Sequence, residues 1–69
     1  MALEDVIDEL VRECGARAYS FSLNWSEAEW CFYAGASGLG KGEFVEVKRV
    51  ASMLGAAKRL LALVKEEAR

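Results

Sequence analysis

The sequence predicts an α+β fold in which two helices cover one face of an antiparallel β-hairpin, in the order α-β-β-α. Apolar residues recur with helical spacing near both ends of the chain and alternate with a period of two between them. A glycine-dense segment then separates the second alternating stretch from the last helix. The chain has 69 residues, no proline and no low-complexity tract, so we expect a single domain spanning residues 1–69.

The first helix is predicted from Ala2 to Cys14. Its apolar residues follow one another at steps of three and one, which places them on a single helical face. Acidic residues in the first turn favour the positive end of the helix dipole. Gly15 stands where a left-handed residue commonly closes a helix. The apolar stripe consists of Leu3, Val6, Ile7, Leu10, Val11 and Cys14.

Two alternating stretches on either side of residues 24–27 predict a hairpin. We expect residues 24–27 to be its turn, because they are short and mostly polar. The residues expected beneath the helices are Tyr19, Phe21, Leu23, Trp30 and Phe32. The residues expected on the less covered face are Ser20, Ser22, Cys31 and Tyr33.

The second half of the chain predicts a loop over residues 35–42 and then a long amphipathic helix from Glu43. From Val47 to Val64 the apolar residues step alternately by three and four. Residues 43–47 leave two assignments open, because their β-branched residues would also suit a short third strand. Gly55 inside the helix is less favourable than alanine by ~1 kcal/mol, and we expect it where a neighbouring backbone or a bulky aromatic side chain comes close.

The small size of the chain predicts that it needs a further stabilising contact, since small domains bury too little surface. The sequence has no histidine, and its two cysteines, Cys14 and Cys31, are expected to be reduced and buried, so we expect no metal and no cofactor. Both edges of a two-stranded sheet are open to another chain. We therefore expect a homodimer, built either from two hairpins joined in one sheet or from packed long helices.

The motifs typical of catalysis are incomplete. Residues 35–42 match a phosphate-binding loop except that Gly42 stands where a Ser or Thr would hold Mg²⁺, and a chain this short cannot supply the parallel sheet. Without histidine there is no His-assisted serine or cysteine nucleophile. We therefore expect that the protein is not an enzyme.

Charge is unevenly distributed along the chain. Residues 1–13 hold five acidic residues and one basic residue, whereas residues 41–65 hold six basic and two acidic residues. We expect the two halves to attract one another, and the overall net charge of −2 makes nucleic acid the less favoured partner. The candidate anion or nucleic-acid contacts are Lys41, Lys48, Arg49, Lys58 and Arg59.

Trp25 is the most informative residue for a binding function, and two interpretations of it remain open. Within a turn, its indole either anchors a partner, as tryptophan often does in interface hot spots, or folds over the end of the protein's own core. The candidate protein contacts are Trp25, Tyr33, Ser20, Ser22 and Cys31.

The approach to the last helix resembles that of double-stranded-RNA-binding domains. The resemblance covers residues 38–64 and implies RNA or DNA binding. Those domains have three strands between their helices, where this sequence offers two clear ones, and Glu43 and Glu46 would oppose a phosphate-contacting surface. The matching residues are Gly38-Leu39-Gly40-Lys41, Lys48-Arg49 and Ala56-Ala57-Lys58.

The layout as a whole is similar to small α-β-β-α sandwich proteins encoded by bacteriophages. An aromatic-rich strand at residues 29–33 and an alanine- and leucine-rich helix at residues 56–63 support this resemblance, which implies an accessory or inhibitor protein directed at a host machine. No stretch approaches the ~18 apolar residues of a membrane span, and the first residues are acidic, so we expect a cytoplasmic location and no membrane contact. The leading hypothesis is a non-enzymatic protein-interaction module, and the alternative is a small nucleic-acid-binding protein.

Overall fold

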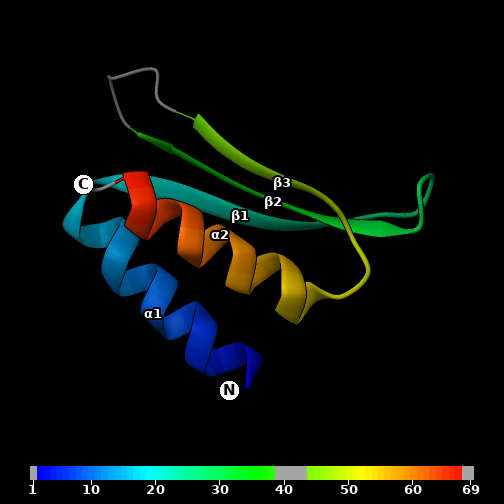
Figure 1. The fold of residues 1–69 in the computed structure, drawn as a ribbon, viewed down its shortest axis with the longest axis horizontal. Helices are drawn as coiled ribbons and strands as arrows, with labels where there is room; N and C mark the ends of the chain where they lie inside the picture. The colour runs from blue at the N-terminus through cyan, green and yellow to red at the C-terminus, as the bar shows by residue number, and fades with distance from the viewer. Residues whose placement is uncertain (1, 39–43, 68–69) are drawn as a thin grey trace.

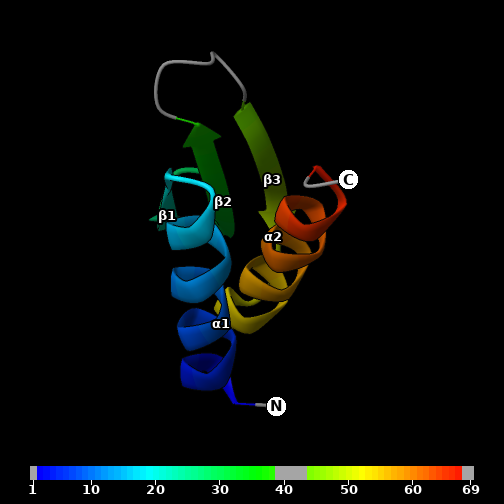
Figure 2. The same ribbon diagram turned by 90° about the vertical axis from the view of Figure 1, so that its left-hand side faces the viewer.

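The chain folds in the order α-β-β-β-α, with three strands where the sequence predicted two (Figure 1). A computed structural model describes residues 2–38 and 44–67. Its elements are α1 (Leu3–Ala16), β1 (Tyr19–Ser26), β2 (Cys31–Gly38), β3 (Phe44–Val50) and α2 (Met53–Glu67). The predicted α+β class is confirmed, and so is the placement of both helices on one face of the sheet, as Figure 2 shows. The prediction of a simple hairpin is wrong.

The three strands form one antiparallel sheet in the order β1-β2-β3. The register between β2 and β3 shifts once, because Phe32 pairs with Val50 while Ala34 pairs with Val47. Between these two pairs, β3 advances by three residues while β2 advances by two, so β3 contains one extra residue, a β-bulge. Arg49 lies in this bulge with a φ of 57°, a left-handed conformation that L-residues seldom adopt. The extra residue returns Val50 to the helix-covered face.

The third strand displaces the start of the last helix. We predicted that helix from Glu43, but α2 begins at Met53. Before it, Ser52 accepts a hydrogen bond from the backbone N–H of Gly55 at 3.0 Å, which is the N-cap interaction of a helix. A Cβ at Gly55 would lie 3.0 Å from the side chains of both Ser52 and Val50, so its close neighbours are these two side chains and not the backbone or bulky aromatic that we expected.

The end of α1 also differs from the prediction. The helix continues past Gly15 to Ala16, and the residue with a left-handed backbone is Ala18, at a φ of 58°. The Arg17 guanidinium donates to the Glu13 carbonyl oxygen at 2.7 Å and to its carboxylate at 2.6 Å. The bond to the carbonyl satisfies a free acceptor in the last turn of α1. The Arg17 side chain thus caps the helix, a role that we had predicted for Gly15.

The core is one apolar cluster between the helices and the covered face of the sheet. Small residues at its centre let α2 approach the strands closely, and Cys14 is buried there at 1% exposure as predicted. Val11, which the helical stripe placed in the core, is instead 57% exposed. The cluster consists of Val6, Leu10, Cys14, Ala34, Ala36, Val47, Val50, Ala56, Ala57, Leu60, Leu61 and Val64.

The β1–β2 turn lies later in the sequence than predicted. β1 continues to Ser26, so Trp25 is a strand residue that pairs with Phe32, and residues 27–30 form the turn. Trp30, which we predicted in the core, lies in that turn with a φ of 51° and is 76% exposed. The turn projects beyond the helices in Figure 1.

Part of the glycine-dense segment is strand and not loop. Residues 35–38 belong to β2, while residues 39–42 lie outside the described residues. Only the first half of the phosphate-loop match, residues 35–38, therefore lies in the described part of the chain, and there it is strand. In the described ranges 2–38 and 44–67, no helix is long and apolar enough to cross a membrane.

Candidate interaction surfaces

The uncovered face of the sheet bears a polar cluster centred on Glu29. The Tyr33 hydroxyl donates a hydrogen bond to the Glu29 carboxylate. The same carboxylate lies 3.9 Å from Arg49 Nε and 4.0 Å from Cys31 Sγ. Glu29 belongs to the turn, Tyr33 and Cys31 to β2, and Arg49 to β3. One exposed carboxylate thus connects the hairpin turn with both neighbouring strands, and we call these four residues the Glu29 cluster.

Hydrogen bonding in the Glu29 cluster changes the acidity of Tyr33. The bond to Glu29, together with some desolvation and the nearby Cys31 thiol, raises the pKa of the Tyr33 phenol from 10.0 to about 12. The cause is that ionisation would remove the donated proton and place two negative charges side by side. The phenol is therefore a stable donor at neutral pH and does not serve as a base.

Cys31 lies on the predicted face but offers little surface to a partner. It alternates with the covered residue Phe32 and shares the outer face with Tyr33, yet it is only 7% exposed. Both cysteines are free, and burial raises the pKa of the Cys14 thiol. The described residues contain no group of three or more His, Cys, Asp or Glu side chains that could hold a metal ion.

Ser20 and Ser22 are exposed on the outer face, as the alternation in β1 predicted. They line a shallow hollow of ≈160 Å³ together with Gly35 and Phe44. Phe44 is 61% exposed, and its ring lies 3.5 Å from where a Cβ of Gly35 would stand. The sequence analysis did not single out Phe44. Its alternation with Val45 and Val47 would have placed it on this face if the third strand had been chosen.

Three aromatic side chains gather at the hairpin end. The ring centroids of Trp25 and Trp30 are 5.5 Å apart in an edge-to-face arrangement, and those of Trp25 and Phe32 are 4.8 Å apart. Trp25 is 46% exposed. Trp25 thus packs on aromatic side chains of its own chain and still exposes nearly half of its surface, and its role as an anchor for a partner stays a prediction. We call Trp25, Trp30 and Phe32 the aromatic cluster.

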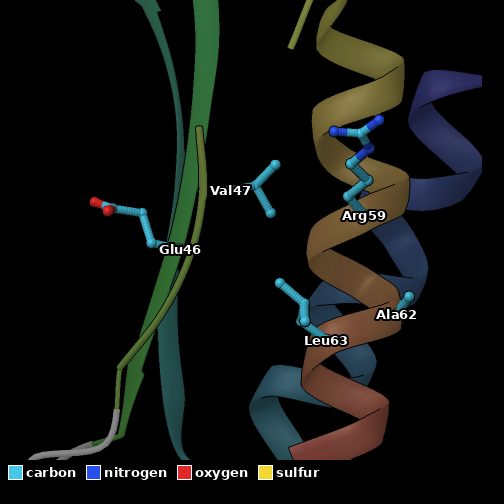
Figure 3. A pocket seen from close by; sticks show the side chains of 5 residues that line it. All are labelled: Glu46, Val47, Arg59, Ala62 and Leu63. Carbon is cyan, nitrogen blue, oxygen red and sulfur yellow. The ribbon is translucent and has the colours of Figure 1, made fainter. Parts of the chain in front are cut away.

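A groove opens between the outer edge of the sheet and α2 (Figure 3). Its volume is ≈390 Å³, and we call it the edge groove. In Figure 3, Val47 of β3 and Leu63 of α2 extend toward it from opposite sides, whereas Glu46 points away from the helix. Its lining residues are Glu46, Val47, Arg59, Ala62 and Leu63.

The structure distributes the candidate basic residues over two elements. On β3, Lys48 Nζ lies 3.1 Å from Glu46 Oε1, and Arg49 Nε lies 3.9 Å from the Glu29 carboxylate. The exposed Lys58 and Arg59 belong to α2. The fifth candidate, at position 41, lies outside the described residues. Acidic neighbours therefore offset the charge on β3.

The predicted attraction between the two halves of the chain is represented by one contact between the helices. Lys65 Nζ of α2 lies 2.5 Å from Glu9 Oε2 of α1. Both side chains are partly exposed, so solvent screens the pair and its contribution to stability is small.

Three comparisons with known proteins identified no relative of this chain. A scan against protein-family models, a search of curated proteins and a search of solved structures all found no match to this chain.

Proposed function

We propose that this chain is a non-enzymatic protein-binding module that works as a homodimer joined through an edge of its sheet. The observation that supports this most directly is the sheet itself. Both helices cover the same face, and in the described part of the chain neither β1 nor β3 has a strand on its outer side. Unpaired edges present rows of backbone donors and acceptors, which another strand can satisfy.

The aromatic cluster supports a binding function as well. Trp30 exposes 76% of its surface at the end of the projecting turn, and Trp25 exposes 46%. Large aromatic side chains supply much of the binding energy of protein interfaces. The cluster lies at the hairpin end and so leaves the sheet edges free. The accessory or inhibitor role implied by the phage resemblance would use this surface on a second protein.

The test of self-association is the solution mass measured by light scattering over a wide range of protein concentration. We expect twice the 7.6 kDa of the chain at high concentration, with dissociation on dilution. A mass of one chain at every concentration would contradict the homodimer. The cytoplasmic location, which two free cysteines suit, remains a prediction.

Nucleic-acid binding is the second candidate, and the element order favours it. The third strand, one of the two assignments that the sequence left open for residues 43–47, gives the helix–three strands–helix order of double-stranded-RNA-binding domains. The residues fit less well, because residues 38–41 precede β3 and not the last helix. The outer face of α1 also bears Glu4, Asp5 and Asp8, which repel phosphates.

The two candidates differ in their salt dependence. A nucleic-acid-binding protein should bind a short double-stranded RNA at low salt, with an affinity that falls steeply as salt is added. Fluorescence anisotropy of a labelled duplex measures this directly. Absence of binding at low salt would remove this candidate and leave the protein-binding module.

A further inference from the structure

The order of charges on β3 suits pairing with a second copy of itself. Glu46 and Lys48 both project from the outer face of this edge strand, and Lys48 Nζ lies 3.1 Å from Glu46 Oε1. Val47 stands between them and points to the covered face, where it is 5% exposed. The strand therefore presents an acid and a base at equal distances on either side of a valine.

A two-fold axis makes the order Glu46-Val47-Lys48 complementary to the same order on a second copy of the chain. When two identical strands pair antiparallel about an axis through Val47, Glu46 of each chain stands opposite Lys48 of the other. An axis through Glu46 or through Lys48 would place like charges directly opposite each other, which is destabilising. Among these three registers, only the one centred on Val47 pairs opposite charges, and it does so twice.

We propose that two copies of the chain join β3 to β3 about a two-fold axis at Val47, with two reciprocal Glu46–Lys48 pairs fixing the register. This inference rests on the proposed homodimer and specifies its interface. The result is one continuous six-stranded sheet with all four helices on the same face.

The edge groove accommodates this arrangement. It lies on the helix side of β3, where Val47 and Leu63 extend toward it from the strand and from α2. In the paired sheet, the second copy's Val47 arrives beside the first on this same face. Its apolar side chain covers Leu63 and Ala62, which α2 otherwise leaves partly open to solvent.

The same features disfavour other strands at this edge. Charged side chains and a bulge normally protect an edge strand from indiscriminate pairing. Here the bulge at Arg49 ends the regular part of β3, and the charges at Glu46 and Lys48 accept only a strand with the reversed order. The edge of β1 does not select a partner strand by charge, because its outer-face residues between Tyr19 and Ser26 are uncharged.

Charge reversal tests the register. Glu46→Lys and Lys48→Glu each make both cross-strand pairs repulsive, and we expect each variant to associate about 10- to 100-fold more weakly than the parent. A mixture of the two variants restores opposite charges at both pairs, so we expect a heterodimer of near-parental affinity. The double variant Glu46→Lys/Lys48→Glu should also form a homodimer. The readout is mass by light scattering, with circular dichroism to verify folding.

Asn24→Lys is the matched control, because it places a charge on the exposed outer face of the other edge strand. It should leave the dimer unchanged. If both β3 variants dimerise like the parent, or if only Asn24→Lys dissociates, the β3 interface is wrong while the homodimer stands. A parent chain that remains monomeric overturns both.

A milder variant covers the case in which charge reversal prevents folding. Glu46→Gln removes one partner of each pair without introducing repulsion, and we expect it to weaken association about 3- to 10-fold. If the axis passed through Glu46, the same substitution would remove repulsion and strengthen association. A stronger dimer would therefore overturn the register centred on Val47.

Discussion

At the scale of single residues, Glu29 and Trp30 are the positions that sequence patterns described least well. Glu29 looks like an ordinary charged residue next to a strand, yet its carboxylate contacts Tyr33, Cys31 and Arg49. The contact with Arg49 depends on the position of β3, which no local pattern specifies, whereas Cys31 and Tyr33 are only two and four residues away in the sequence. Trp30 continues the alternation of β2 backwards by one step, but it adopts a left-handed backbone that is rare for a bulky residue.

The raised pKa of Tyr33 gives a pH-dependent prediction. Because the pKa in the folded chain exceeds its ordinary value of 10.0, the hydrogen bond to Glu29 stabilises the fold fully below pH 10, and this contribution is lost as the pH rises through about 12. Ultraviolet absorption of the phenolate should show a tyrosine that ionises well above pH 10. Glu29→Gln should bring that transition to lower pH.

Glu27→Gln is the control for this titration, since it removes a carboxylate from the same turn without touching the bond to Tyr33. It should leave the late transition in place. If Glu29→Gln and the parent titrate alike, the hydrogen bond is not the cause of the raised pKa.

At the scale of elements, the sequence predicted both helices, the class of the fold and the first strand, but it left residues 43–47 open between helix and strand for an identifiable physical reason. The bulge makes Val47 and Val50 face the core three residues apart, and a step of three imitates a helix. The further step of four to Leu54 crosses from the strand into α2 and extends the imitation. The spacing of apolar residues alone cannot distinguish a helix from a bulged strand that is followed directly by a helix.

The left-handed residue after α1 gives a prediction for this element. Ala18 has a φ of 58°, a conformation in which a Cβ costs roughly 1–2 kcal/mol. Ala18→Gly should therefore raise the free energy of unfolding by roughly 0.5–1 kcal/mol, after the greater entropy of glycine in the unfolded chain is subtracted. Urea unfolding followed by circular dichroism measures the change.

Ala16→Gly is the matched control two residues earlier, at the last residue of α1, where the backbone is helical. There glycine should lower the free energy of unfolding, by at most the roughly 0.5–1 kcal/mol that it costs in the middle of a helix. If both substitutions destabilise the protein equally, the left-handed conformation at Ala18 is not a source of strain.

At the scale of the whole molecule, a single apolar cluster joins all five elements, directly or through the partly buried residues packed against it. Its members on the helices were largely predictable, because amphipathic spacing marks them. Ala34 and Ala36 were not, since small residues become core only where a helix lies close. The candidate site was predictable to a similar degree: the outer-face residues of β1 and β2 were placed correctly, whereas Phe44 and the edge groove required the third strand.

Because the core is one apolar cluster, a substitution at a single buried position should affect the stability of the whole chain. Leu10 is fully buried, and Leu10→Ala should lower the free energy of unfolding by about 2–5 kcal/mol, a large share of the stability of a domain this small. Val11→Ala, at the next position but 57% exposed, should change it by no more than about 0.5 kcal/mol. Chemical denaturation compares the two. Similar losses of unfolding free energy in the two variants would show that α1 does not bury Leu10 and expose Val11 as described.

The aromatic cluster also makes the hairpin end observable by itself. The chain has two tryptophans, and both lie there, with their rings 5.5 Å apart and outside the core cluster. Intrinsic fluorescence therefore reports on the β1–β2 turn, while far-ultraviolet circular dichroism reports on the helices. Binding at the turn should change the emission of the unlabelled protein. Pairing through β3, at the opposite side of β2 from β1, should leave that emission unaltered. The molecule thus contains an optical probe that can tell its two proposed contact surfaces apart.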